Sequence, residues 1–249
     1  MNTENIEAPK HSDPLSEFVC TLTIDERRVL KGKLSKTIPL YFDNNNNLSF
    51  SEKFSEKNFN HLAATLRAIS PNCRSIPRNG VIFRGFPDWL KGNTLLNLQR
   101  ESETRRLEPL DRIDHYLGCG GRYADQLSVD ESLIKFVEQK VREKIKATGV
   151  ASYLYYDKPG LGIKPHVDTD VFSINMMLML KHDCKDNESR SATLIFPESS
   201  ATESHRLDIG EVMLMYGGAV IHSRSIIIED ENVCLLTIGF NICDKEISS

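Results

Sequence analysis

The chain has 249 residues, of which 40% are hydrophobic and 27% are charged, proportions typical of a globular protein with a buried core. Its formal net charge is −4, so the surface as a whole does not attract polyanions, which disfavours a dedicated nucleic-acid binder. No apolar run reaches the roughly 18 residues that a membrane span requires, so the sequence predicts no membrane partner.

The six cysteines lie singly along the chain and form no C-x-x-C pair. Residues 1–15 are polar and contain no apolar run that resembles a signal peptide. Because a chain of this length does not need disulfides for its stability, the pattern predicts reduced thiols and a cytoplasmic location. These features leave the oligomeric state open.

The first part of the chain predicts a tail followed by short mixed elements. Residues 1–17 combine polar residues and proline without periodicity, which predicts a disordered tail. Apolar residues at helical spacing predict a helix over 55–69. The run 80–87 is typical of a short strand that stops at Gly-Phe-Pro, whereas the charged region 91–112 fits no single element.

The clearest predicted helix runs from about Val129 to Ala147. Ser128 and Glu131 have the spacing of an N-terminal capping box, and an apolar stripe follows at helical spacing. Lysines in the expected last turn and Gly149 just beyond it suit the C-terminal end of a helix.

From residue 150 onward the chain changes to short strand-like runs separated by turns. Six closely spaced strands of this kind predict a sandwich or a barrel. We therefore expect 18–149 to be a mixed, largely helical elaboration of the same domain, and 150–249 to form its β core. The predicted strands are 151–156, 171–180, 192–196, 211–216, 219–228 and 233–242.

A candidate metal site lies in the run Pro165-His166-Val167-Asp168-Thr169. Side chains alternate along a strand, so His166 and Asp168 point to the same face and can reach one ion. A third ligand must come from elsewhere, and His222 is a candidate in the strand-like run after Gly217-Gly218. Two imidazoles and one carboxylate on one face leave the opposite positions open, which suits non-haem Fe(II) oxygenases. Structural zinc sites are usually closed and often contain sulfur.

Four landmarks around these residues resemble a known family. The stretch 153–169 is similar to the first metal motif of the Fe(II)/2-oxoglutarate-dependent oxygenases, in which a tyrosine, a glycine-containing turn and His-x-Asp follow in this order. Downstream, 192–197 looks like the strand before the family's loop, and 207–212 looks like its turn into the next strand. The run 217–222 matches the approach to the distal histidine. The likeness is to the branch that contains prolyl 4-hydroxylases and nucleic-acid demethylases.

This resemblance covers about residues 150–242 and implies a fold and a chemistry. The implied fold is α+β, with a double-stranded β-helix (jelly-roll, cupin-like) core and N-terminal helices packed on one sheet. The implied site holds Fe(II) through His166, Asp168 and His222 as metal-binding and catalytic residues, with 2-oxoglutarate and O2 as co-substrates. Because the carboxylate of Asp168 is retained, the resemblance implies hydroxylation, desaturation or cyclisation rather than halogenation.

The binding of 2-oxoglutarate needs a cation, because an unpaired buried carboxylate is very unfavourable. The family carries an arginine or lysine on the strand after the distal histidine, but 229–241 contains neither. Two substitutes are available. Arg224 lies two residues after His222 and so on the same face of a continuing strand, and Lys181 ends the predicted strand 171–180, 15 residues after His166. We favour Arg224, because a guanidinium can bind a carboxylate through two hydrogen bonds.

A tyrosine is a further candidate for co-substrate binding. Tyr156 precedes the first histidine ligand by ten residues, a spacing that resembles that of the family's co-substrate tyrosine. A core position is an equally good interpretation of an aromatic strand residue. Tyr153 and Tyr155 point to the other face and are expected to pack, while Asn175 and Thr193 are candidate polar linings of the cavity.

The sequence is compatible with three hypotheses about function. The preferred substrate is a small amino-acid-like molecule or a peptidyl side chain, because the chain has no obvious second recognition domain. Oxidative demethylation of nucleic acid is an alternative that the acidic balance and the lack of a basic stripe disfavour. The other alternative is a catalytically silent jelly roll for protein interaction, in which the histidines only form hydrogen bonds.

Overall fold

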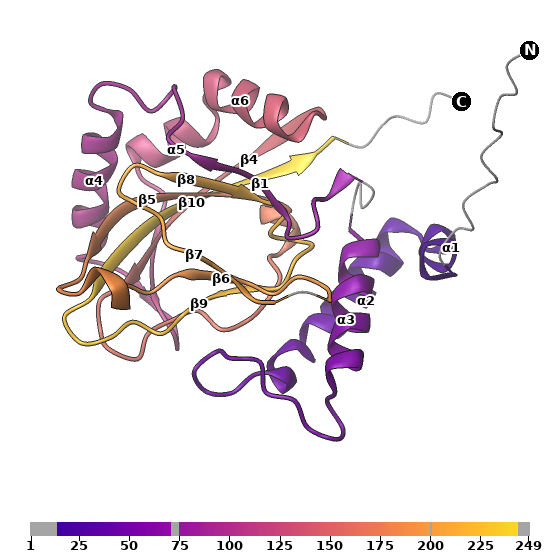
Figure 1. Cartoon of the computed structure of the whole chain (residues 1–249). Coiled ribbons are helices and arrows are strands. Elements are labelled where there is room, and N and C mark those ends of the chain that lie inside the picture. Colours follow the sequence, from indigo (N-terminus) through magenta and orange to yellow (C-terminus); the bar gives the residue numbers. More distant parts are fainter. Residues whose placement is uncertain (1–13, 71–74, 200, 244–249) are drawn as a thin grey trace, which may run out of the picture.

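The computed structural model describes residues 14–70, 75–199 and 201–243, and two antiparallel β-sheets form its centre. The larger sheet has seven strands and the smaller sheet has three, and the two lie in separate layers (Figure 1). In sheet order, the larger one contains β1 (Val81–Gly85), β8 (Val212–Met215), β5 (Ile174–Asp183), β10 (Asn232–Ile242), β4 (Ile145–Tyr156), β3 (Tyr116–Cys119) and β2 (Leu110–Asp111). The smaller one contains β7 (Glu203–His205), β6 (Thr193–Ile195) and β9 (His222–Arg224).

The middle of the larger sheet is buried on both faces. Strand β10 pairs with β4 on one side and with β5 on the other, and nearly all residues of β5 and β10 are buried. Helices cover the outer face, and the smaller sheet lies across the inner one (Figure 1). Burial on both faces explains why these strands are continuous apolar runs rather than alternating ones.

Three helices cover the outer face of the larger sheet: α4 (Thr94–Arg105), α5 (Arg122–Ser128) and α6 (Glu131–Val141). The side chain of Asp130 caps α6 by accepting hydrogen bonds from the amides of Ser132 and Leu133. Buried side chains at helical spacing on α6, Leu133, Val137 and Val141, pack into the main core.

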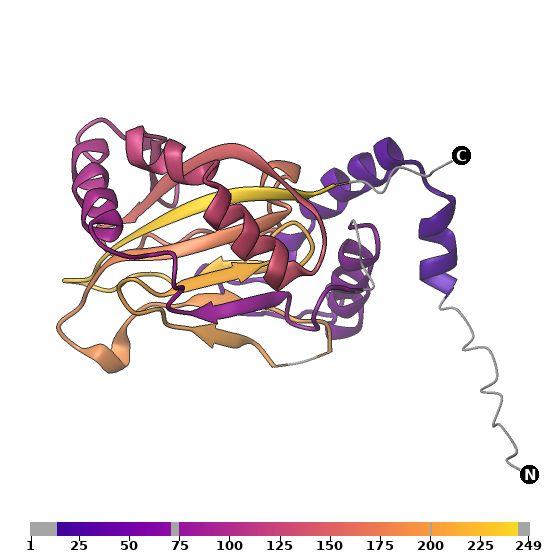
Figure 2. The same ribbon diagram turned by 90° about the horizontal axis from the view of Figure 1, so that it is seen from above.

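A second group of helices lies at the other end of the molecule, away from α4 (Figure 2). It consists of α1 (Pro14–Thr21), α2 (Ile24–Ser35) and α3 (Glu56–Ala68). Phe59 and Leu66 of α3 belong to a separate apolar cluster with Val167, Phe196 and Ile221. Short 3-10 turns lie at Ile38–Tyr41, Asp170–Phe172 and Asn187–Ser189. Every described helix is too short or too polar to cross a membrane.

The predicted helix over 129–147 is too long. Val141 and Ile145 are both buried and four residues apart, which is compatible with a helix. However, Arg142 adopts a left-handed conformation with φ of 62°, which ends α6. Ile145 then begins β4 and pairs with Ile242 in the sheet.

The other predictions of secondary-structure elements are only partly confirmed. Each of the six predicted strands overlaps a strand of the structure, but β7 and the charged helix α4 were not predicted. Residues 14–17 of the expected tail lie in α1, and the rest of that tail lies outside the described residues. The expected boundary at residue 150 falls within β4, and β1, β2 and β3 from the N-terminal part join the larger sheet.

Candidate metal centre

The candidate ligands lie on two neighbouring backbone segments. His166 and Asp168 belong to an extended segment that runs antiparallel to β9, and His222 is the first residue of β9. The amide of His166 donates to the His222 carbonyl at 3.0 Å, and the reverse bond is 2.9 Å long. Since directly paired residues of an antiparallel ladder point to the same face, the two imidazoles lie side by side with ring centroids 4.5 Å apart.

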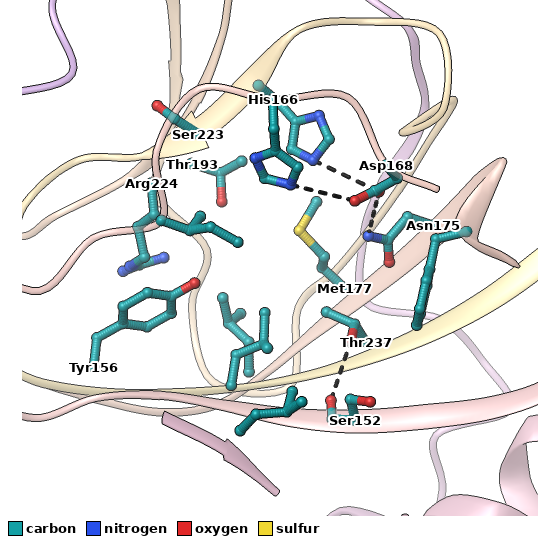
Figure 3. Close-up of a pocket in the computed structure, with 16 residues that line it drawn as sticks. Ser152, Tyr156, His166, Asp168, Asn175, Met177, Thr193, Ser223, Arg224 and Thr237 are labelled. Atoms are coloured by element: carbon teal, nitrogen blue, oxygen red, sulfur yellow. Dashed lines mark hydrogen bonds and ion pairs between the residues drawn. The ribbon is translucent and has the colours of Figure 1, made fainter. Parts of the chain in front are cut away.

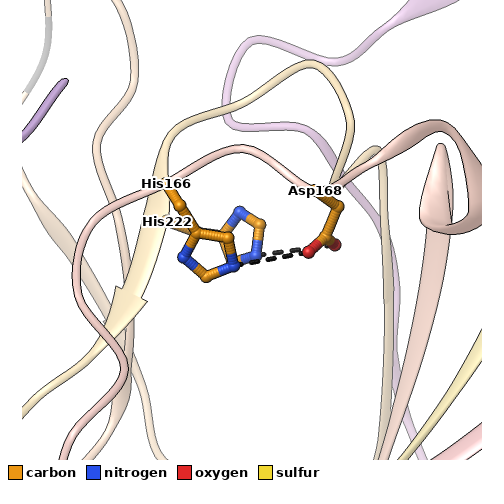
Figure 4. A group of neighbouring side chains, drawn as sticks. All are labelled: His166, Asp168 and His222. Atoms are coloured by element: carbon orange, nitrogen blue, oxygen red, sulfur yellow. Dashed lines mark ion pairs between the residues drawn. The ribbon is translucent and has the colours of Figure 1, made fainter. Parts of the chain in front are cut away.

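The three functional groups converge on one point (Figure 4). The Nε2 atom of His166 is 3.3 Å from Oδ1 of Asp168, and the Nε2 atom of His222 is 3.6 Å from Oδ2 of the same carboxylate. One ligand atom from each residue lies within 4.8 Å of the others, a spacing that a single ion can bridge. Within the described part of the chain, no other group of three potential metal ligands is this close.

Backbone carbonyls orient both imidazoles. The Nδ1 atom of His166 is 2.7 Å from the carbonyl oxygen of Lys164, and the Nδ1 atom of His222 is 2.9 Å from that of Val220. A carbonyl only accepts, so each Nδ1 carries the proton and donates it. The Nε2 lone pairs therefore face the shared point, which is the arrangement found in metal-binding histidines.

Asp168 is held in place by its neighbours. Asn175 donates from Nδ2 to Oδ2 of Asp168 at 2.8 Å. Gly217 leaves room for the carboxylate, because a Cβ atom at this position would lie 2.1 Å from Oδ2. The Asp168 amide also donates to the Gly217 carbonyl at 2.8 Å. These contacts orient the carboxylate towards the two imidazoles.

The protonation states suit a divalent cation. Burial tends to raise the pKa of Asp168, but the nearby histidines and Asn175 outweigh it and lower this pKa to about 2. Burial also lowers the pKa of His222, which favours the neutral imidazole. The pKa of His166 is raised, because its hydrogen bond to Asp168 and the carboxylate charge outweigh burial. Metal binding at this centre must therefore displace a proton from His166 at moderately acid pH.

A cavity of about 190 Å³ lies beside the three residues, between the two sheets (Figure 3). Arg224 and Tyr156 lie on one side of it, and Asp168 and Asn175 lie on the opposite side. The remaining lining is largely apolar with a few hydroxyl groups. Those residues are Leu117, Ser152, Leu154, Ile163, Phe172, Met177, Thr193, Ser223, Leu235 and Thr237, together with both candidate histidines.

Arg224 places a buried cation at this cavity. The residue is 2% exposed, and its Nη2 atom donates to Ser191 Oγ at 2.7 Å. Its Nε atom is buried without a hydrogen-bond partner. Among the described residues, no carboxylate forms a direct ion pair with it, and a buried charge without a direct partner is costly. An anionic ligand would supply the missing partner.

Tyr156 lies beside this guanidinium, whose central carbon is 5.4 Å from the centroid of the tyrosine ring. Its hydroxyl points into the cavity (Figure 3). Burial raises the pKa of Tyr156 above its usual range, so the hydroxyl keeps its proton and can donate it. Tyr153 and Tyr155 face away, where their hydroxyls donate to Glu101 and to the Ser102 carbonyl.

Lys181 does not reach the cavity, contrary to the sequence-based expectation. Its Nζ atom lies 3.2 Å from Asp183, and 47% of its side chain is exposed. A bulge in β5 is the cause, because Met179 pairs with Leu235 whereas Lys181 pairs with Cys234. The extra residue between them reverses the alternation, so Lys181 shares the outer face with Cys234.

Some residues at this site were not predicted from the sequence. Ser191, which contacts Arg224, is a lone serine before a short strand and has no distinguishing pattern. Gly217 was noted only as part of a turn, although the Gly-Gly pair signals a position where side chains do not fit. Asn175 and Thr193 do line the cavity, as expected, and Asn175 also contacts Asp168.

Comparison with known proteins shows the fold. No family model matches the chain, and no curated protein matches its sequence. Among solved structures, it is similar to the non-heme alpha-ketoglutarate-dependent epimerase SnoN of nogalamycin biosynthesis, with 13% identity, a TM-score of 0.55, and coverage of 71% of this chain and 82% of that one.

Two further solved structures are similar to a comparable extent. A prolyl-4-hydroxylase from Pseudomonas putida has 15% identity and a TM-score of 0.52, over 73% of this chain and 99% of that one. EctD from S. alaskensis, solved with 2-oxoglutarate and 5-hydroxyectoine, has 12% identity and a TM-score of 0.52, over 80% and 81%. These likenesses confirm the predicted fold class: the chain has the double-stranded β-helix fold of the 2-oxoglutarate and Fe(II) oxygenases.

Proposed function

We propose that the chain is a non-haem Fe(II)- and 2-oxoglutarate-dependent oxygenase, with its iron held by His166, Asp168 and His222. One observation carries the proposal: two pre-oriented Nε2 atoms and a carboxylate converge beside a cavity that also contains a buried, unpaired guanidinium. The first group suits a divalent cation, and the second suits the distal carboxylate of an organic acid. 2-Oxoglutarate joins these two requirements in one molecule.

The donor set fits iron better than structural zinc. Two neutral imidazoles and one carboxylate on one face leave the other coordination positions free for ligands. No cysteine lines the cavity among the described residues, so the closed, sulfur-containing set of many zinc sites is absent there. Fe(II) bound here would supply the activation of dioxygen. The protein residues would hold the ion and leave space for the co-substrate.

Arg224 and Tyr156 would bind the distal carboxylate of 2-oxoglutarate. Arg224 and the hydroxyl of Tyr156 lie on the same side of the cavity, and the Nε–H of Arg224 has no hydrogen-bond partner in the protein. A charge-assisted hydrogen bond in a buried site is strong and directional. Two of the similar solved structures, SnoN and EctD, were each solved with this co-substrate, which supports 2-oxoglutarate as the ligand. Lys181 has no role in this scheme.

Asp168 bears on the type of reaction. It provides the carboxylate ligand, and the Asn175 hydrogen bond keeps one of its oxygens fixed. With this carboxylate in place, no coordination position is freed for a halide. The proposed reactions are therefore hydroxylation, desaturation or cyclisation. Apolar walls around the centre would exclude water from the reacting groups.

The cavity lining indicates the chemistry of the substrate group that is oxidised. Apart from the three proposed ligands and Arg224, no described residue of the lining is charged. Leu117, Leu154 and Phe172 contribute apolar walls, and Ser152 and Thr237 contribute hydroxyl groups. A neutral, mainly aliphatic group fits this surface, since an unpaired charge would not be compensated. We propose a small molecule or a peptidyl side chain whose charged groups remain outside the cavity.

An anaerobic titration tests the proposal. The apoprotein is loaded with Fe(II), 2-oxoglutarate is added, and the weak visible charge-transfer band of the chelate is followed. The band is expected in the wild type and should disappear in His166→Ala. His61→Ala is the matched control, because His61 is exposed on α3 and lies outside the cavity lining.

Two results would contradict the proposal in different ways. A band of undiminished strength in His166→Ala would refute the assignment of this ligand. A wild-type protein that takes up no Fe(II) and gives no band would instead support a catalytically silent jelly roll.

A further inference from the structure

Arg224 is the last member of a hydrogen-bonded series of four buried polar side chains. The other members are Ser191, Glu231 and His182, and each of the four is at most 8% exposed. They come from distant parts of the sequence: His182 from β5, Ser191 from the segment before β6, and Glu231 from the turn before β10. Buried polar groups need hydrogen-bond partners, and these four side chains supply such partners to one another.

The direction of the hydrogen bonds in this series is determined by chemistry. Ser191 Oγ lies 2.6 Å from Glu231 Oε1 and 2.7 Å from Arg224 Nη2. A carboxylate only accepts and a guanidinium only donates, so the single serine proton goes to Glu231. The Ser191 oxygen then accepts from Arg224. The hydroxyl is thus a bridge between a buried anion and a buried cation.

Glu231 is itself fully engaged. Its Oε1 atom accepts from the Ser191 amide at 2.7 Å and lies 2.8 Å from His182 Nε2, and its Oε2 atom accepts from the Ile228 amide at 3.1 Å. Burial tends to raise the pKa of Glu231, but the bonds from His182 and Ser191 outweigh it and lower this pKa to about 2. The carboxylate therefore stays ionised, and it is held by groups other than Arg224.

We propose that Ser191 is a positioning residue for 2-oxoglutarate, because its hydroxyl holds Arg224 in a fixed orientation and keeps it separate from Glu231. This inference rests on the proposed function of Arg224. A direct Arg–Glu ion pair would occupy the guanidinium and compete with the co-substrate. With one hydroxyl between them, Glu231 compensates the buried positive charge, while the unpartnered Nε–H of Arg224 remains free for a second carboxylate.

The proposal predicts a selective loss of affinity in Ser191→Ala. The affinity of the anaerobic Fe(II) protein is measured from the charge-transfer band for 2-oxoglutarate and for 2-oxobutyrate, which chelates metal but lacks the distal carboxylate. The Kd for 2-oxoglutarate should rise about 10- to 100-fold, as for a lost hydrogen bond to a charged group. The Kd for 2-oxobutyrate should change by less than about twofold, because its binding does not use Arg224.

Two further variants complete the test. Ser204→Ala on β7 is the matched control, because Ser204 is exposed and outside the cavity lining, and both affinities should stay at wild-type values. Glu231→Gln retains the shape of the side chain but removes the anion. It should show the same selective loss as Ser191→Ala, which keeps the test available if the alanine variant does not fold.

The outcomes separate this inference from the proposed function. Tight 2-oxoglutarate binding in the wild type, with no selective loss in Ser191→Ala or Glu231→Gln, would overturn the positioning role and leave the oxygenase proposal intact. Equal losses for both 2-oxo acids would also overturn it, since they indicate general damage to the centre. A wild-type protein that forms no chelate band with either acid would overturn the proposed function itself.

Discussion

Replacing Gly217 with alanine should damage the metal centre while leaving the fold intact. The new methyl group would lie 2.1 Å from Asp168 Oδ2 and 3.1 Å from the Cβ atom of Asn175. Gly217 does not have a positive φ, so its backbone conformation is open to alanine. The strain therefore falls on the Asp168 carboxylate, which is the movable group.

The size of the effect follows from the distances. The carboxylate oxygen has to retreat by at least about 1.3 Å, from 2.1 Å to an ordinary contact of 3.4 Å, whereas metal–ligand distances tolerate only about 0.2 Å. Loss of a supporting contact alone typically costs 10- to 100-fold in metal affinity. We therefore expect the Kd for a divalent metal to rise by at least about 10- to 100-fold in Gly217→Ala.

Calorimetric titration with Mn(II), a redox-stable substitute for Fe(II), measures this change. Gly32→Ala in α2 is the matched control, because a Cβ atom there meets nothing within 4 Å and alanine favours the helix. Unfolding curves of the metal-free proteins should be similar for Gly217→Ala and the wild type. A Gly217→Ala protein that binds Mn(II) as tightly as the wild type would refute the assignment of Asp168 as a ligand in this position.

Three other changes test separate parts of the structure. Tyr156→Phe should weaken 2-oxoglutarate binding about 5- to 30-fold by chelate titration, through loss of one buried hydrogen bond, and an unchanged Kd would exclude the tyrosine from this role. Glu231 has a folded-state pKa near 2 against an ordinary value of 4.5, so it stabilises the fold above pH 4.5 and this stability, roughly 3 kcal/mol, is lost as pH falls towards 2. Urea unfolding of Glu231→Gln between pH 6 and 3 should therefore show a shallower pH dependence than the wild type, and parallel curves would contradict it. Asp130→Ala removes the cap of α6 and should lower the free energy of unfolding by about 1 kcal/mol without changing metal affinity; a change in that affinity would mean that α6 is coupled to the centre.

The sequence was most informative where local spacing determines geometry. His166 and Asp168 are two residues apart in an extended segment, so their common face followed from alternation alone. The sequence placed His222 within a strand-like run after the Gly217-Gly218 turn, and the structure begins β9 at His222 and pairs it with His166. The same alternation predicted that Arg224 points to the same face as His222. Apolar runs bounded by turns likewise revealed most strands of the core.

The sequence was uninformative where distant contacts decide the outcome. The bulge that turns Lys181 outward exists only in the pairing of β5 with β10. The end of α6 at Arg142 precedes a strand whose partner, Ile242, lies a hundred residues away. Ser191 links Arg224 to Glu231 through the packing of three separate segments. None of these contacts leaves a periodic pattern in the chain.

The rigidity of the centre follows from its position on paired backbone segments. Reciprocal hydrogen bonds join His166 to His222, and a further bond joins Asp168 to Gly217. Carbonyl contacts and Asn175 then restrict the rotation of the side chains. Such support from strands and outer contacts holds a site within the narrow geometry that metal binding requires.

The most direct test of the whole account is a crystal structure of the protein with Mn(II) and 2-oxoglutarate, with an anomalous difference map for the metal. We predict one main peak within about 2.3 Å of Nε2 of His166, Nε2 of His222 and one oxygen of Asp168. The distal carboxylate of the co-substrate should lie against Arg224. A metal peak elsewhere in the molecule, with no density between these three side chains, would contradict the account.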